Sequence, residues 1–264
     1  MTTVDTGAWI RSNRLGTRML AIRPEQLSVF EDAVRPTLVA EATQRLAVRH
    51  GRYFAALGPA VVRAVVEHGM RRAEQLGAGT EWGIDAVTEL VLILGAGFDR
   101  DPLLPWVGEF FASAPSGPAA GELPLLSGLV SRYVEETAGP HGVAMRLALQ
   151  RLASFEWGAW SVPPMQRRGD AIGPVLAALY PEKVSALDRR GLLGTLLRAG
   201  EATATRHGLT DDRGSLLCVV LTLVLGAHFD DDPQFPWARG FTTTAALLDD
   251  AYGFLQRVVA AVEA

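Results

Sequence analysis

The sequence predicts an all-α protein built from two homologous helical units in tandem. Apolar residues recur at helical spacing through most of the 264 residues, and no stretch alternates apolar and polar residues for long enough to predict a strand. An unusual phrase also occurs twice: GAGFDRDPLLPW at 95–106 and GAHFDDDPQFPW at 226–237. Helical periodicity, the lack of strand patterns and the repeat together indicate a duplicated helical fold.

The repeat extends beyond the phrase itself. When the two phrases are aligned, the register continues backward without a gap over residues 68–106 and 199–237. Fifteen of these 39 aligned positions are identical, and they include glycines and leucines that precede the phrase. The repeated segment therefore covers two predicted helices and the turn that follows them.

The first unit is expected to contain three helices before the phrase. Residues 24–48 mix charged and apolar positions at helical spacing, and Pro36 is expected to kink or split this helix. Residues 58–77 carry one apolar stripe and end at a glycine suited to a C-cap. A third helix follows the capping residue Thr80 and becomes apolar on every face, which is typical of a buried central helix.

The second unit follows the same plan, with helices predicted within 189–208 and 211–226. Between the units, residues 113–124 (SAPSGPAAGELP) have the composition of a loop. The predicted organisation is an N-terminal tail at 1–20, helical unit one at 21–125 and helical unit two at 126–264.

The repeated phrase is interpreted as a structural corner between two helices. Asp-Pro starts turns because the Asp side chain accepts backbone N–H groups while Pro fixes φ. The second proline of each phrase suits the first turn of a following helix, and the aromatic residues are expected to pack against the core. The residues of this corner are Phe98, Asp99, Asp101, Pro102, Pro105, Trp106, Phe229, Asp230, Asp232, Pro233, Pro236 and Trp237.

Three other roles for the phrase remain open at this point: a metal loop, a catalytic pair of carboxylates and a partner-binding corner with an exposed Trp. A calcium loop needs further oxygen ligands and a bidentate Glu, which neither phrase supplies, so no metal site is predicted. Carboxylate pairs serve acid–base catalysis, but the sequence marks no nucleophile or base beside them.

The remaining reactive residue types form no recognised constellation. The five histidines have no metal-ligand spacing with one another or with Cys218, the single cysteine, which lies in an apolar run and reads as a buried thiol. No glycine-rich phosphate loop or nucleophile elbow occurs. The sequence therefore predicts no catalytic residues and no cofactor.

Charge and hydropathy limit the partners. The formal net charge of −4 gives no basic footprint for nucleic acid. The longest apolar run, 216–227, is shorter than the ~20 residues of a membrane-spanning helix, and no signal peptide is evident. A cytoplasmic location is expected.

An aromatic segment, FEWGAWSVPPMQR at 155–167, has no counterpart in unit one. It is interpreted either as packing between the units or as a hook for another protein. The candidate partner-binding residues are Phe155, Trp157, Trp160 and Met165.

Taken together, the opening Arg-Pro-Glu-Gln-Leu at 23–27, the glycine-spaced helix 69–77 and the Phe-Asp-x-Asp-Pro-x-x-Pro-Trp phrase carry a resemblance. They are similar to a poorly characterised family of small all-helical bacterial proteins whose genes often lie near those for the spike proteins VgrG and PAAR of type VI secretion systems. Most members carry the unit once, and unit two departs from the Glu-Gln-Leu opening. The resemblance implies a secretion or toxin context and supplies no catalytic residues.

Two function classes follow. The first is a non-enzymatic protein-binding protein: an adaptor, chaperone or immunity-type partner of a secreted effector or a spike component. The second is a hydrolase or metal-dependent enzyme that uses the acidic residues of the two phrases in a groove between the units. If the four acids converge within a few ångströms in one cleft, the enzyme or metal site is favoured. If the two corners lie far apart and their Asp side chains bond to helix amides, it is disfavoured.

Overall fold

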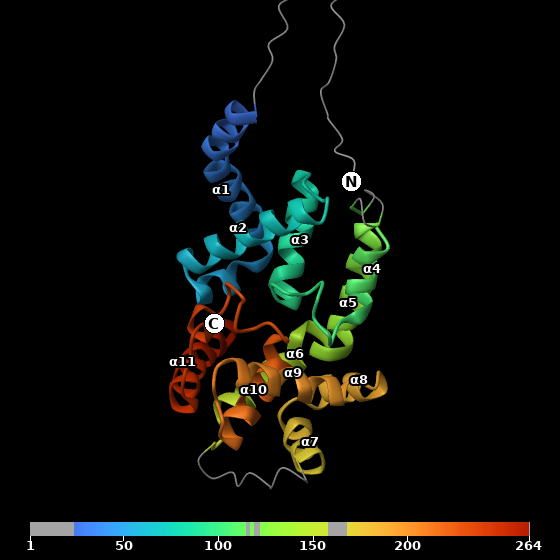
Figure 1. Cartoon of the computed structure of the whole chain (residues 1–264), viewed down its shortest axis with the longest axis vertical. Coiled ribbons are helices and arrows are strands. Elements are labelled where there is room, and N and C mark those ends of the chain that lie inside the picture. Colours follow the sequence, from blue (N-terminus) through green and yellow to red (C-terminus); the bar gives the residue numbers. More distant parts are fainter. Residues whose placement is uncertain (1–23, 115–116, 119–121, 158–167, 264) are drawn as a thin grey trace, which may run out of the picture. The chain divides into compact units, whose positions relative to one another are not determined.

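A computed structural model describes residues 24–114, 117–118, 122–157 and 168–263. All regular secondary structure in these ranges is helical, which confirms the predicted all-α class (Figure 1). The elements are α1 (Pro24–Leu57), α2 (Pro59–Gln75), α3 (Glu81–Leu94), α4 (Pro105–Ala112), α5 (Leu123–Ala138), η1 (Pro140–Gly142), α6 (Val143–Ala153), α7 (Arg168–Leu179), α8 (Pro181–Arg189), α9 (Leu193–Arg206), α10 (Asp212–Leu225), η3 (Pro236–Ala238) and α11 (Thr244–Glu263).

The chain divides into two compact parts, Met1–Leu38 and Val39–Ala264. The second part contains the buried core and the sites described below. The sequence-based division near residue 125 remains a prediction, and α5 begins at Leu123.

Two closely packed helix pairs, α2 with α3 and α9 with α10, form the framework. Each pair crosses at a glycine that the repeat alignment shares. A Cβ on Gly69 would lie 2.2 Å from Oγ1 of Thr88, and a Cβ on Gly200 would lie 2.5 Å from Cα of Val219. These glycines let the helix backbones approach more closely than any side chain would permit.

The second helix of each pair begins with the same kind of cap. Thr80 Oγ1 accepts a hydrogen bond from the amide of Gly83 at 3.1 Å, and Asp211 Oδ1 accepts one from Gly214 at 2.6 Å. Such side-chain caps satisfy amides that have no partner within the helix. The central helix α10 is buried along most of its length, as its uniform apolar character predicts.

Two local expectations were wrong. Helix α1 is not split at Pro36, and its non-helical dihedral angles occur instead at His50 (φ −118°, ψ 18°). After the second phrase, Pro236 begins only the short turn η3. Gly240, with φ of +72°, redirects the chain before α11 starts.

Candidate functional site

The two repeated phrases fold as corners that follow α3 and α10. Each corner begins at a glycine with positive φ, +95° at Gly95 and +103° at Gly226. The phenylalanine three residues later is buried in both corners, as predicted, with Phe98 0% and Phe229 1% exposed. The corner is thus fixed by a glycine turn and an aromatic plug.

Asp101 and Asp232 organise the turn inside their own corners. Oδ1 of Asp101 accepts the amide of Leu103 at 2.8 Å, and Oδ1 of Asp232 accepts the amide of Gln234 at 2.8 Å. Each aspartate thereby accepts a hydrogen bond from the amide two residues later, across the proline that lies between them. These bonds support the turn chemistry proposed for the Asp-Pro steps.

The second carboxylate oxygen of each aspartate reaches the other corner. Oδ2 of Asp101 accepts the amide of Ala227 at 3.0 Å, and Oδ2 of Asp232 accepts the amide of Ala96 at 2.6 Å. We call these two contacts the reciprocal carboxylate bonds. They join segments more than 120 residues apart in sequence, and each satisfies a buried amide just beyond the end of a central helix.

Glycine is required where these carboxylates arrive. A Cβ on Gly95 would lie 3.3 Å from Oδ2 of Asp232, and a Cβ on Gly226 would lie 3.3 Å from Oδ2 of Asp101. The positive φ and the close approach of the opposite carboxylate both disfavour a larger residue. The shared glycines therefore belong to the contact between the corners as well as to the helix ends.

The other two acids of the phrases form ion pairs. Asp99 accepts from Nε of Arg72 at 3.1 Å, and Asp230 accepts from Arg206 at 2.8 Å and lies 2.9 Å from Nε2 of His207. Burial acts to raise the pKa of Asp230, but the bonds from Arg206 and His207 outweigh it and lower the pKa below its ordinary value.

The corners therefore meet, but their four acids are already engaged by amides, arginines and a histidine. Oδ1 of Asp230 is buried without a hydrogen-bond partner, whereas a metal ion or substrate that approached the other carboxylate oxygens would have to displace their donors. Among the described residues no group of three or more His, Cys, Asp or Glu side chains is placed to hold a metal ion. This geometry favours a structural role for the repeated acids.

The two tryptophans of the phrases are half-buried and pack on aromatic neighbours. The ring centroid of Trp106 lies 5.9 Å from that of Tyr133, and the centroid of Trp237 lies 5.5 Å from that of Phe254. Pro105 starts α4 as expected. The tryptophans thus attach each corner to a later helix of the chain.

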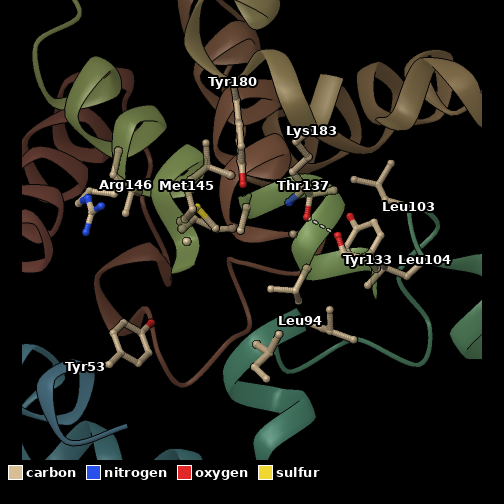
Figure 2. Close-up of a pocket in the computed structure, with 18 of the residues that line it drawn as sticks. Tyr53, Leu94, Leu103, Leu104, Tyr133, Thr137, Met145, Arg146, Tyr180 and Lys183 are labelled. Atoms are coloured by element: carbon tan, nitrogen blue, oxygen red, sulfur yellow. Dashed lines mark hydrogen bonds between the residues drawn. The ribbon is translucent and has the colours of Figure 1, made fainter. Parts of the chain in front are cut away.

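A cavity of about 540 Å³ lies beside the meeting point of the corners. Its wall includes Leu94 and Asp101 of the first corner, Gly226 of the second, and side chains from α1, α5, α6 and α8 (Figure 2). Tyr180 and Lys183 enter it from the start of α8, and Tyr133 and Thr137 enter it from α5 (Figure 2). The reciprocal carboxylate bonds hold one wall of this cavity in place.

Lys183 is the chain's only lysine, whereas every other basic side chain apart from the histidines is arginine. Its Nζ lies 6.0 Å from the ring centroid of Tyr180 and, within the described ranges, has no hydrogen-bonding partner. Burial lowers the pKa of Lys183 from 10.5 to about 8, and the nearby charge of Asp101 only partly opposes this shift.

The tyrosines around this lysine are strongly desolvated. Burial raises the pKa of both Tyr133 and Tyr180, and the charge of Asp101 adds to the shift at Tyr133. Both side chains therefore stay neutral hydroxyl donors over the physiological pH range. A lysine and two phenols that line one cavity can bind an anion.

Sequence reasoning did not identify this cavity. Lys183 occurs in PEKVSALD, a pattern typical of an exposed helix, and the tyrosines are far apart in sequence. The uniqueness of the lysine was the one available signal. Lys183 is the single lysine of a chain that otherwise uses arginine, and it lies in the wall of this cavity.

A second depression, the α3–α5 groove, runs between those two helices and has a volume of about 350 Å³. Trp82 and Ile93, which are 49% and 42% exposed, project from α3, and Val130 and Val134 line it from α5. On one rim, Glu89 is paired with Arg49 at 3.2 Å. The groove thus offers an apolar surface beside charges that are already paired.

The aromatic segment is only partly described. Trp157 is 7% exposed and packs in the core, with its ring centroid 4.8 Å from that of Phe155, whose carbonyl accepts a hydrogen bond from Tyr252. This placement matches the packing interpretation for Trp157 and leaves little of its ring for a partner. Trp160 and Met165 lie outside the described residues.

Cys218 is fully buried in α10, and burial raises the pKa of its thiol to about 12. It therefore stays a protonated apolar side chain, as its position in the apolar run predicts. None of the described helices is long and apolar enough to traverse a lipid bilayer. Comparisons with protein-family models, with curated proteins and with solved structures find no match to this chain.

Proposed function

We propose that this chain acts by binding another protein rather than by catalysis, as an adaptor, chaperone or immunity-type partner in a bacterial secretion or toxin system. The context comes from the resemblance carried by the repeated phrase. The choice of binding over hydrolysis is supported by the four phrase acids, which all accept hydrogen bonds from other groups of the fold. A tandem duplication is supported in the same way by the equivalent caps and the reciprocal carboxylate bonds.

The observation that carries the proposal is the α3–α5 groove with its half-exposed tryptophan. Trp82 exposes 49% of its surface at one end of the groove, and Ile93 exposes 42% at the other end of the same helix. Large apolar side chains kept at the surface mark interaction sites, and tryptophan is the residue type most enriched among binding hot spots.

The groove suits an amphipathic helix of the partner. It lies between two helices and has an apolar floor, which is the geometry into which helical segments dock through side chains at i, i+3 and i+4. The rim carboxylates are held by arginines, with Asp85 2.6 Å from Nε of Arg45 and Glu89 3.2 Å from Nε of Arg49. Because these charges are neutralised within the chain, apolar contacts are expected to supply most of the affinity.

The test is affinity purification from the native cell with the wild-type chain, Trp82→Ala and Leu125→Ala, followed by binding measurements with the purified partner. Leu125 is 67% exposed on α5 but does not line the groove, so it is the matched control. We expect Trp82→Ala to weaken binding by about thirtyfold or more, the usual effect at a hot spot, with Leu125→Ala unchanged. Equal affinity of the Trp82→Ala variant and the wild type would contradict the proposal.

A further inference from the structure

The cavity beside the corners continues into a second, smaller one. The neighbouring cavity measures about 280 Å³ and shares Tyr53, Ile93, Met145 and Leu225 with the 540 Å³ cavity. The two adjoining cavities make up the region between Lys183 on α8 and Phe254 on α11. We call it the Lys183 channel.

One end of the Lys183 channel presents hydrogen-bond donors without partners. Within the described part of the chain, the ammonium of Lys183 and the hydroxyls of Tyr133 and Tyr180 make no hydrogen bond, and Figure 2 shows the Lys183 nitrogen and the Tyr180 hydroxyl directed into the space. Donors that line a cavity and make no bond within the chain are available to an acceptor that enters the cavity. An occupant of this end is therefore expected to bring acceptor atoms.

The charges at this end favour an anion. Among the described residues of the wall, Asp101 is the only carboxylate, and both of its oxygens already accept backbone amides. Arg146 adds a second cation to the wall, and His50 and His141 are the other titratable groups that face the space besides the tyrosines. The uncompensated charge is thus positive, which a carboxylate would balance through charge-assisted hydrogen bonds.

The other end is apolar and has no free polar group. Its wall includes Phe235, Phe254 and Val258, and its one amide side chain, Gln234, is already engaged. Gln234 accepts from the hydroxyl of Tyr53 at 3.0 Å and donates to the carbonyl of Val91 at 2.9 Å. Such a wall fits an aliphatic chain and offers nothing to a polar ligand.

We infer that the Lys183 channel binds a long-chain carboxylate, with its head on Lys183 and Tyr180 and its aliphatic chain directed toward Phe254. The site is separate from the α3–α5 groove and does not depend on the protein-binding proposal. The cation and the phenols select the carboxylate, and the apolar end selects the chain. The cation alone would not distinguish a fatty acid from a short acid, and the apolar end alone would not distinguish it from a fatty alcohol.

Calorimetric titration of the full chain with three probes separates these contributions. Palmitate carries head and chain, hexadecanol has the chain without the charge, and butyrate has the charge with almost no chain. We expect palmitate to bind at least about tenfold more tightly than hexadecanol, the minimum for a charge-assisted contact, and butyrate to give no signal. Palmitate binding no tighter than hexadecanol, or no binding of palmitate, would overturn the inference.

Variants of the lysine then test the site. Lys183→Met is expected to weaken palmitate about tenfold or more while leaving hexadecanol unchanged, and Lys183→Arg is expected to retain part of the preference for the acid. Arg132→Met removes an exposed cation from α5, the helix that carries Tyr133, and serves as the matched control. If Lys183→Met binds palmitate as tightly as the wild type, the head group does not lie on Lys183 and the assignment is wrong.

Discussion

At the scale of single residues, the four aspartates at the positions that the repeated phrases share perform two different tasks. Asp99 and Asp230 pair with arginines, whereas Asp101 and Asp232 accept backbone amides from both corners. The two aspartates that recur in each phrase therefore have different structural roles. Of these four side chains, those of Asp101 and Asp232 connect the two corners.

Replacing Asp232 by Ala removes the acceptor for the amides of Gln234 and Ala96. Each buried amide left unpaired costs about 1–3 kcal/mol, and loss of the desolvated charge returns a part of this, so a net loss of about 2–4 kcal/mol is expected. Urea unfolding measures the change. The control is Asp231→Ala, at an exposed position of the same loop, which should stay within about 0.5 kcal/mol of the wild type. Equal effects of both variants would contradict the structural role of Asp232.

Replacing Lys183 is expected to have the opposite effect on stability, because the fold disfavours the charged form of this side chain. The pKa falls from 10.5 to about 8, so the unfolded chain binds more protons between these values and the folded state gains stability as pH rises through this window. Below pH 8 the full free-energy cost of holding the protonated Lys183 in the fold is present. Lys183→Met should therefore raise the free energy of unfolding by up to about 3 kcal/mol at pH 7, with the gain shrinking toward pH 10.

Thermal or urea unfolding at pH 7 and pH 10 checks this trend. A Lys183→Met variant that is less stable than the wild type at pH 7 would show that the ammonium is not desolvated at a cost. A stabilised variant would show that Lys183 lowers the stability of the fold. A lysine with such a cost is expected at a position where it serves binding.

At the scale of elements, much of the framework follows from the sequence. The caps at Thr80 and Asp211 and the buried helix α10 are visible in residue types and periodicity. The break at His50 was not predicted, because no residue type there signals a helix break, whereas Pro36 is a recognised helix breaker. The second phrase predicted a helix start because Pro236 matches Pro105. Gly240 follows only four residues later and ends the turn before a helix forms.

The helix crossings give a prediction at this scale. Gly69→Ala would place a methyl group 2.2 Å from Oγ1 and 2.8 Å from Cα of Thr88, so α2 and α3 must separate. We expect a loss of about 1–3 kcal/mol, in the range for overpacking. Gly128→Ala, in α5 where a Cβ meets nothing within 4 Å, should instead stabilise by up to about 1 kcal/mol. Circular dichroism during heating compares the two, and destabilisation by both would mean that the crossing distance is not the cause.

At the scale of the whole molecule, the sequence does not reveal which residues meet. Register and turn chemistry identify two corners, but the bonds from Asp101 to Ala227 and from Asp232 to Ala96 are tertiary contacts without a local signal. The Lys183 channel is invisible for the same reason, since helices distant in sequence supply its wall. Of the candidate site, the two structural corners could be predicted from the sequence, whereas the contacts between them and the cavity could not.

The central claim is that each corner is completed by the carboxylate of the other, and amide hydrogen exchange measured by NMR tests it most directly. The exchange rates of the Ala96 and Ala227 amides are compared in the wild type, Asp101→Ala and Asp232→Ala. We predict a crossed pattern: Asp232→Ala accelerates exchange at Ala96, and Asp101→Ala accelerates exchange at Ala227, because each loses its acceptor. If each substitution affects only the amides of its own corner and the opposite alanine stays protected, the corners do not hold one another and the account is wrong.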